Sequence, residues 1–336
     1  MSKKDEAPPP THTELIQGLI GVAEKNHGKG AILWGDSSSI LSKVEFISSG
    51  ALSLDLALGG GYARGRVIEI YGPEMAGKST LALHAVAQAQ RMGLTCAIAD
   101  TEHSLDNSYA TKLGVNMDEV LFSQPDNAEQ ALDIMDLLVR SGLIGLIILD
   151  SVAALVPKAE LEDDHGTHHP GAQARLMSQA LRKLVGIVKK SNTTIIFTNQ
   201  LRMKIGVFFG SPEVVSGGNA LKFYATQRLD IRRKEVLSQG EDKYGVVAKI
   251  KVVKNKVYRP FKETLVDIEF DKGISLAKDI LRLGVQHKVI EKAGSWYSYK
   301  EEKLGQGEAN STLFLEEHPE MMEAIKNEIL TLVNLP

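Results

Sequence analysis

The stretch from Gly72 to Ser79 reads G-P-E-M-A-G-K-S and fits the pattern G-x-x-x-x-G-K-S. The run V-I-E-I-Y at 67–71 leads into it, and an alanine-rich stretch from Thr80 to Met92 follows. This order of strand, glycine loop and helix is the expected setting of a phosphate-binding loop, so a chance match in a glycine turn is the weaker interpretation. The spacing therefore predicts a P-loop NTPase core.

The residue types in this loop explain how it can hold a triphosphate. Gly72 and Gly77 let backbone N–H groups turn toward an anion, and the N-terminus of the next helix adds partial positive charge. Lys78 can reach the β- and γ-phosphates, and the Ser79 hydroxyl can hold Mg²⁺. The expected nucleotide contacts are Gly72, Pro73, Glu74, Met75, Ala76, Gly77, Lys78, Ser79 and Thr80.

Size and composition are typical of a soluble globular protein. The chain has 336 residues, 43% hydrophobic and 24% charged, which suits one large domain and one smaller domain. Cys96 is the single cysteine, so a buried thiol in a reducing cytoplasm is expected rather than a disulfide. Residues 1–10 lack the apolar core of a signal peptide, and no run of about 18 apolar residues predicts a membrane span.

An amphipathic helix is expected after a disordered leader over residues 1–10. Thr11 and Glu14 have the spacing of a capping box. Apolar residues then recur at helical spacing, namely Leu15, Ile16, Leu19, Ile20, Val22 and Ala23. The helix must bury this stripe on the chain's own core or on a neighbouring subunit, and the pattern leaves both possibilities open.

Short apolar runs that end in polar residues alternate with helical patterns in the next section. The runs end near Glu102, at Asp150 and at Gln200, and the patterns over 128–141 and 173–190 separate them. This alternation predicts a largely parallel sheet covered by helices. Ligands of such folds lie beyond the carboxyl ends of the strands, so the three polar side chains should converge near the phosphate loop.

Two loops and an antiparallel section interrupt this regular order. The loops are expected over 157–173 and 201–218, and strand-like patterns follow over 228–232, 246–253 and 264–270. The composition then shifts to helix with one hairpin-like piece over 294–300. We therefore expect an ATPase-type core over residues 40–273 and a smaller domain over 274–336.

The three strand-end side chains suit phosphate chemistry. Asp150 stands at the Walker B position, where a carboxylate orients Mg²⁺ through water, although a strand-end carboxylate can also cap the next helix. Glu102 can polarise a water aimed at the γ-phosphate, or it can be a first-turn helix acid. The Gln200 amide can bond the γ-phosphate, or it can be an ordinary surface residue.

The loop after Gln200 combines two cations, Arg202 and Lys204, with two adjacent aromatics, Phe208 and Phe209. Cations that meet phosphates and aromatics that meet bases suit single-stranded nucleic acid, although the phenylalanines can also pack inward. A second basic stretch runs from 249 to 259, where a solvated strand face is the commoner interpretation.

The chain resembles the bacterial RecA-type recombinases over residues 16–309. Four stretches in the same order carry the resemblance: G-P-E-M-A-G-K-S at 72–79, L-I-I-L-D-S-V-A-A-L at 146–155, N-Q-L-R-M-K-I-G-V at 199–207 and G-G-N-A-L-K-F-Y-A-T-Q-R at 217–228. The first occurs in many NTPases, whereas the last is far more specific. The resemblance implies an α/β fold with a RecA-like P-loop NTPase core, an oligomerisation segment over 11–39 and a small α+β DNA-binding domain over 274–336.

The resemblance also implies roles for residues of the nucleotide site. Glu102 matches the family's catalytic carboxylate, and Gln200 matches its γ-phosphate sensor, so that with Lys78 they form the expected catalytic set. Asp106 and Tyr109 match residues that contact the adenine. Ser79 and Asp150 remain the expected Mg²⁺ ligands.

Other matched residues imply an assembled, DNA-bound state. Lys254 and Lys256 match lysines that reach the ATP of the adjacent protomer, and Phe223 matches an aromatic at that interface. The loops over 162–171 and 201–215 match two loops that line a filament axis. The implied contacts to single-stranded DNA are Arg175, Arg202, Lys204, Ile205, Gly206, Phe208, Phe209, Gly217, Gly218 and Asn219.

The implied activity is that of a DNA-dependent ATPase. With ATP and Mg²⁺ it would form a helical homo-oligomeric filament on single-stranded DNA, pair it with double-stranded DNA and exchange strands during recombination and DNA repair. Its location would be cytoplasmic. A self-cleaving repressor of the DNA-damage (SOS) response is a further candidate partner.

The chain departs from the family pattern at several positions. Asn107 and Ser108 replace a Pro-hydrophobic pair beside the adenine, and Pro170 replaces an apolar wedge. Glu308 stands where lysine is common, which should weaken duplex binding, and the long acidic tail of many relatives does not follow Pro336.

The loop around Pro170 also holds Asp163, Asp164, His165, His168 and His169. Three interpretations stay open for these side chains: a metal site, a mobile polar loop, or histidines that strengthen DNA binding in mild acid.

Two other functional classes compete with the recombinase. A ring-forming helicase on the same core would usually carry a further N-terminal assembly domain. A nucleotide-gated DNA-coating or signalling scaffold would be natural without a catalytic carboxylate, and Glu102 is present. ATP turnover with and without single-stranded DNA separates the scaffold from the enzymes, and strand exchange separates the recombinase from the helicase.

Overall fold

The computed structural model describes residues 10–34, 44–163, 171–203 and 212–333. The chain divides into two compact units, Met1–Val44 and Glu45–Pro336. The first contains helix α1 (His12–His27), and its predicted capping box is confirmed: the Glu14 N–H donates to Thr11 Oγ1 at 3.3 Å, and the Thr11 N–H donates to Glu14 Oε2 at 2.7 Å. No residue of α1 is buried.

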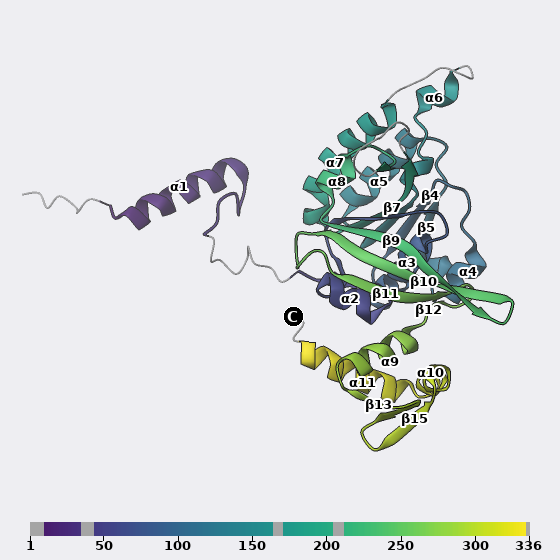
Figure 1. Ribbon diagram of the computed structural model, residues 1–336. Coiled ribbons are helices and arrows are strands. Elements are labelled where there is room, and N and C mark those ends of the chain that lie inside the picture. Colours follow the sequence, from purple (N-terminus) through teal and green to yellow (C-terminus); the bar gives the residue numbers. More distant parts are fainter. Residues whose placement is uncertain (1–9, 35–43, 164–170, 204–211, 334–336) are drawn as a thin grey trace, which may run out of the picture. The chain divides into compact units, whose positions relative to one another are not determined.

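The second unit is organised around a ten-stranded sheet of order β12-β11-β10-β9-β3-β7-β6-β4-β5, with β8 paired to β7 (Figure 1). Its parallel strands are β3 (Val67–Gly72), β4 (Cys96–Asp100), β5 (Val120–Ser123), β6 (Leu146–Asp150), β7 (Thr194–Met203) and β9 (Gln227–Gln239). Its antiparallel partners are β8 (Glu213–Val215), β10 (Asp242–Asn255), β11 (Glu263–Glu269) and β12 (Gly273–Ile274). The predicted largely parallel sheet with an antiparallel section is therefore confirmed.

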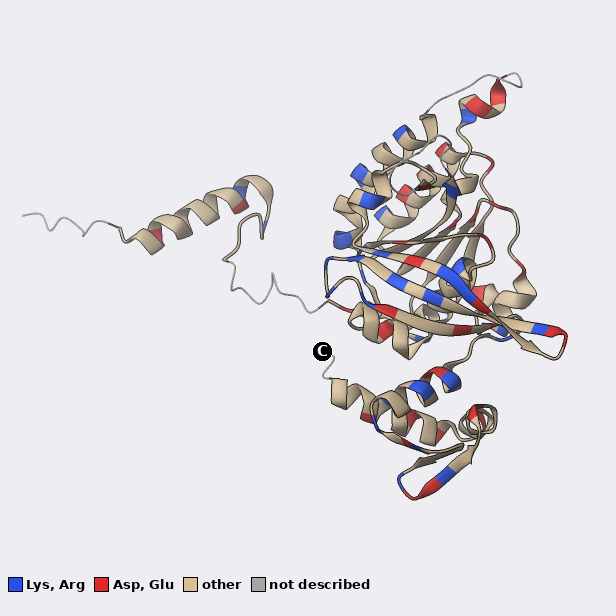
Figure 2. Cartoon of the chain, in the orientation of Figure 1, with Lys and Arg blue, Asp and Glu red and all other residues tan. Residues whose placement is uncertain are grey.

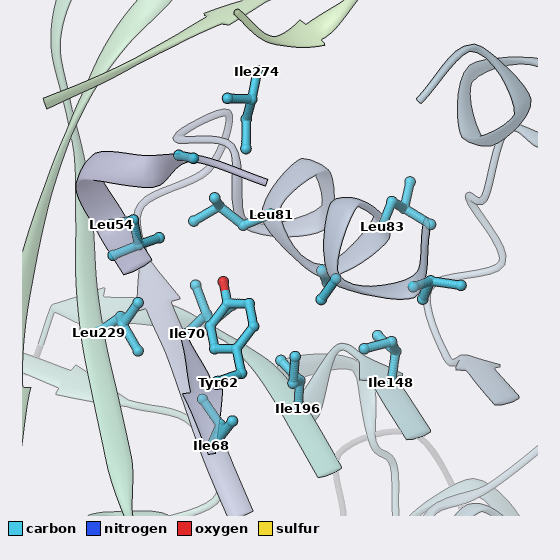
Figure 3. Packing of buried hydrophobic residues seen from close by; sticks show 14 of the residues in the cluster. Leu54, Tyr62, Ile68, Ile70, Leu81, Leu83, Ile148, Ile196, Leu229 and Ile274 are labelled. Atoms are coloured by element: carbon cyan, nitrogen blue, oxygen red, sulfur yellow. The ribbon is translucent and has the colours of Figure 1, made fainter. Parts of the chain in front are cut away.

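Helices cover both faces of this sheet. On one face α3 (Lys78–Arg91) packs Leu81 against Ile70 and Ile196, and α2 (Leu52–Leu58) joins the same cluster (Figure 3). On the other face lie α5 (Ala128–Ser141), α7 (Ala172–Ser191) and α8 (Ala220–Tyr224). Because side chains alternate along a strand, Ile68 and Ile70 of β3 face α3, whereas Val67 belongs to the cluster beneath α7.

Smaller elements complete this core. They are β1 (Phe46–Ile47), paired with β2 (Tyr62–Ala63), together with α4 (Asn107–Lys112) and α6 (Lys158–Glu162). The prediction of a loop over 157–173 is wrong for α6. The prediction of a loop over 201–218 is wrong at both ends, because β7 continues to Met203 and pairs its last residues with β8 in a hairpin.

The C-terminal part packs around a small hydrophobic cluster that also includes Leu52 of α2. It consists of α9 (Leu276–Gln286), β13 (Ile290–Ala293), β14 (Trp296–Tyr299), β15 (Glu302–Gln306), α10 (Glu308–Glu317) and α11 (Pro319–Val333). The three strands form an antiparallel sheet rather than the single hairpin piece that was predicted. Buried side chains such as Leu281, Leu315 and Ile325 hold it together.

Polar contacts fasten α9 to the large sheet. Asp279 Oδ2 accepts from the Ser53 N–H at 2.8 Å, and the buried Asp267 of β11 pairs with Lys278 at 2.5 Å and with Arg282 at 2.6 Å. Arg282 also pairs with Glu308 at 2.6 Å, so the acid that departs from the family pattern has a partner within the fold. Within the described ranges, no helix has the length and apolar character needed to cross a membrane.

Candidate nucleotide-binding and DNA-binding site

The phosphate loop connects β3 to α3, as predicted. Gly77 has a φ of +97°, which favours glycine, and a Cβ there would displace the end of the Ile268 side chain, whose Cδ1 would lie 2.4 Å away. The Lys78 Nζ donates to the Pro73 carbonyl at 2.7 Å, and only 8% of Lys78 is exposed. Burial lowers the pKa of Lys78, while Asp150, Glu102 and Glu74 act in the opposite direction. The amine is therefore held inside the loop, where an anion can replace the carbonyl.

The predicted convergence of the strand ends is confirmed for Glu102 and Gln200. The Gln200 Nε2 donates to Glu102 Oε1 at 3.0 Å, and the Ser151 hydroxyl donates to the same oxygen at 2.5 Å. Both side chains can also turn toward solvent, because Glu102 is exposed and Gln200 half-buried. This pair joins a carboxylate just past the end of one strand to an amide on β7, just before the segment predicted to contact DNA.

Asp150 lies at the end of β6, level with Asp100 of β4. Burial raises the pKa of Asp150, whereas hydrogen bonds from Ser79 and Thr198 act to lower it. The Thr198 hydroxyl lies 2.5 Å from Asp150 Oδ1. A carboxylate and a hydroxyl that face each other are suitable oxygen ligands for Mg²⁺. Within the described ranges no group of three or more His, Cys, Asp or Glu side chains could hold a metal. Mg²⁺ does not require such a group, because it keeps several waters and binds through one or two carboxylates.

A cavity of about 690 Å³ adjoins the phosphate loop. Asp106 and Tyr109, the predicted adenine contacts, both line it. Asp106 also caps α4 by accepting from the Ser108 N–H at 2.8 Å, and the Tyr109 hydroxyl lies 3.0 Å from Thr80 Oγ1. The full lining is Met75, Gly77, Thr80, Asp106, Tyr109, Lys112, Arg233, Val236, Lys243, Val246, Ile268, Phe270 and Asp271.

Sequence reasoning missed Phe270 as a residue of this cavity. It directly follows β11, which is antiparallel, so the rule that ligands lie beyond the carboxyl ends of parallel strands does not mark it. Phe270 is 45% exposed and lines the cavity together with Tyr109, so it adds apolar surface to the wall.

The residues expected to reach a neighbouring protomer do not line this cavity. The Lys254 Nζ instead donates to the carbonyls of Lys222 and Phe223 at 2.8 and 2.9 Å, at the end of α8. Burial, followed by the nearby cations Lys256 and Arg228, lowers the pKa of Lys254 to about 8. The Phe223 side chain is 66% exposed, which leaves a large apolar group in solvent.

The described residues of the predicted DNA surface lie on β7, on α7 and in the segment that leads into α8. The Arg202 Nε donates to Ser216 Oγ at 3.1 Å, and the Gly217 N–H donates to Gln173 Oε1 at 3.0 Å. A Cβ at Gly217 would lie 2.8 Å from Val152 Cγ1, so close packing explains this glycine. Gly218 is similarly tight, Asn219 begins α8, and Arg175 is exposed in the first turn of α7.

Several predicted contacts lie outside the described residues. They are Lys204, Ile205, Gly206, Phe208 and Phe209 of the second loop, and Asp164, His165, His168, His169 and Pro170 of the first.

The basic stretch on β10 is partly neutralised in the folded chain. Lys249 and Lys251 both pair with Glu263 of β11, at 2.8 and 3.2 Å, and acidic and basic bands alternate along these strands (Figure 2). The interpretation of a solvated strand face therefore describes these two lysines.

Comparison with known proteins identifies the family. A family model of the RecA N-terminal domain matches residues 14–275, and one of the RecA C-terminal domain matches residues 278–334. The chain is 56% identical over 324 residues to a Protein RecA of Geobacter metallireducens, covering 96% of each chain. It is 54% identical over 319 residues to a Protein RecA of Legionella pneumophila, covering 95% of this chain and 92% of the relative. The chain therefore belongs to the RecA family.

Proposed function

We propose that this chain is a DNA-dependent ATPase that forms filaments on single-stranded DNA and catalyses homologous pairing and strand exchange in recombination and repair. Membership of the RecA family supports the activity. The observation that carries the mechanism is the 3.0 Å contact between Gln200 and Glu102, because it links the nucleotide site to the segment that leads toward DNA.

The residues around the phosphate loop divide the work of ATP hydrolysis. The ammonium of Lys78 offsets phosphate charge, and Glu102 accepts a proton from the water that it orients. Ser79 and Asp150 are the proposed ligands of Mg²⁺, which supplies charge neutralisation when bound. The Gln200 amide exchanges its bond to Glu102 for one to the γ-phosphate, so its orientation depends on the nucleotide.

Assembly would complete the site. Lys254 and Lys256 are proposed to reach the nucleotide of the adjacent protomer, and the exposed Phe223 to pack at that junction. Such a head-to-tail contact generates an open helix when the rotation between neighbours does not close, and a ring when it does. The exposed apolar stripe of α1, which includes Leu15 and Leu19, is proposed to dock on a neighbouring copy.

DNA binding would follow from this assembly. Arg175, Arg202 and the loop after Met203 are proposed to hold the phosphates and bases of single-stranded DNA, while base pairing between the DNA strands tests homology. The domain after Gly273 is proposed to engage duplex DNA. A cytoplasmic location and a self-cleaving repressor as partner complete the proposal.

Electron microscopy with poly(dT) and a slowly hydrolysed ATP analogue tests filament formation, and strand exchange between homologous DNAs tests the reaction. Regular filaments together with exchanged product are expected. Closed rings that unwind duplex DNA would support a helicase instead, and filaments without ATP turnover or strand exchange would support a scaffold.

A further inference from the structure

Glu69 is a charged residue at the centre of the sheet. It lies on β3, between β7 and β9, and its side chain is fully buried. Its two carboxylate oxygens take partners from opposite strands: Oε1 accepts from Asn199 Nδ2 of β7 at 3.0 Å, and Oε2 accepts from Arg228 Nε of β9 at 2.5 Å. The carboxylate therefore bridges the two strands that flank the phosphate-loop strand.

The β7 partner leads to the nucleotide-facing amide. Asn199 Oδ1 accepts from the backbone N–H of Gln200 at 2.9 Å, and its Nδ2 also donates to the Ser216 carbonyl at 3.0 Å. Asn199 thus contacts the backbone N–H of Gln200 and the carbonyl of Ser216, the residue that directly follows β8. Asn199 contacts the backbone of Gln200, so a shift of that backbone that accompanies a new side-chain orientation alters a hydrogen bond of Asn199.

The β9 partner leads to the surface proposed to meet a neighbour. Arg228 lies 4.8 Å over the Tyr71 ring and stands in register with Lys254 of β10. The Lys254 Nζ in turn holds the last carbonyls of α8, those of Lys222 and Phe223. Arg228 lowers the pKa of Lys254 and Glu69 raises it, so the carboxylate offsets the repulsion between the two cations.

We propose that Glu69 is a positioning residue that couples Gln200 to the α8 surface, so that nucleotide state on one side alters assembly on the other. This inference rests on the function proposed above. A fully buried carboxylate has no water to replace a lost partner, so a displacement of Asn199 must be passed on to Arg228. Stability alone does not explain the group, since apolar residues of similar volume can replace a buried ion pair without loss.

The test replaces Glu69 and Arg228 together with methionine, which removes both bonds without leaving a buried unpaired charge. The quantity measured is the factor by which a slowly hydrolysed ATP analogue strengthens binding to poly(dT). We expect this factor to fall by about tenfold or more, while the affinity of the isolated protein for the nucleotide changes less than about threefold. Glu69→Gln alone, which keeps the shape and loses the charge, should show an intermediate fall.

Asp267→Asn is the matched control, because Asp267 is a similarly buried carboxylate whose two cationic partners both lie on α9 and not on the strands that flank β3. It should lower thermal stability and leave the ATP-dependent factor at the wild-type value. An unchanged factor in the double variant or in Glu69→Gln would overturn the inference, as would an equal fall in Asp267→Asn. If the wild type itself shows no ATP-dependent factor, the proposed function fails instead, so the two failures are distinguishable.

Discussion

Raising the pH should weaken assembly through one amine. Burial and the neighbouring cations lower the pKa of Lys254 to about 8. A lysine is charged below its pKa, so its protonated fraction falls from about nine-tenths at pH 7 to about one-tenth at pH 9. Because only the ammonium can pair with phosphate, the protein concentration that gives half-maximal ATP hydrolysis on single-stranded DNA should rise about tenfold over this interval.

Two variants separate this amine from every other titrating group. Lys254→Arg keeps its charge at pH 9, so its half-maximal concentration should change little with pH. Lys249→Arg changes another lysine of the same strand, one paired with Glu263, and should keep the wild-type pH dependence. The reasoning is refuted if Lys254→Arg shows the same tenfold rise as the wild type.

Three further changes have separate expected outcomes. Glu102→Gln should lower single-turnover hydrolysis by about 10²- to 10⁴-fold with nucleotide binding retained, and near-normal hydrolysis would remove Glu102 from the proposed role. Gly77→Ala should lower the free energy of unfolding in urea by about 1–3 kcal/mol, because alanine is strained at a φ of +97° and its Cβ displaces the end of Ile268; an unchanged value would count against that strain. Burial raises the pKa of Asp55 from 3.8 to about 6, so its protonation stabilises the fold below pH 4, and that stability is lost as the pH rises through 6. The free energy of unfolding of Asp55→Asn relative to wild type should therefore rise by up to about 3 kcal/mol between pH 4 and 7, and a flat difference would contradict the assignment.

The sequence predicted those features that depend on short-range patterns. The helix over Ala128–Ser141 has the predicted bounds, and the phosphate loop, the capping box at Thr11 and the meeting of Glu102 with Gln200 are confirmed. Each follows from residue periodicity or from the rule that parallel strands end on one side of the sheet.

Features that depend on distant partners were not predictable from such patterns. The partners of Glu69 lie 130 and 159 residues away, so nothing local marks a single acid in an apolar strand as part of a polar network. Strand β5 was missed because it has only four residues, and an apolar run as short as residues 120–122 does not separate a strand from a loop. The pairing of β7 with β8 was missed because loop-like composition concealed a short hairpin.

The central claim is that each nucleotide is held between two copies of the chain. Mixing two inactive variants tests it most directly: Lys78→Ala lacks the phosphate-loop amine, and Lys254→Ala with Lys256→Ala lacks the amines proposed to act on the neighbour. In an equal mixture on single-stranded DNA, about one junction in four combines an intact loop with intact neighbouring lysines. The account predicts that ATP hydrolysis returns to about a quarter of the wild-type rate, and a mixture as inactive as its components would contradict it.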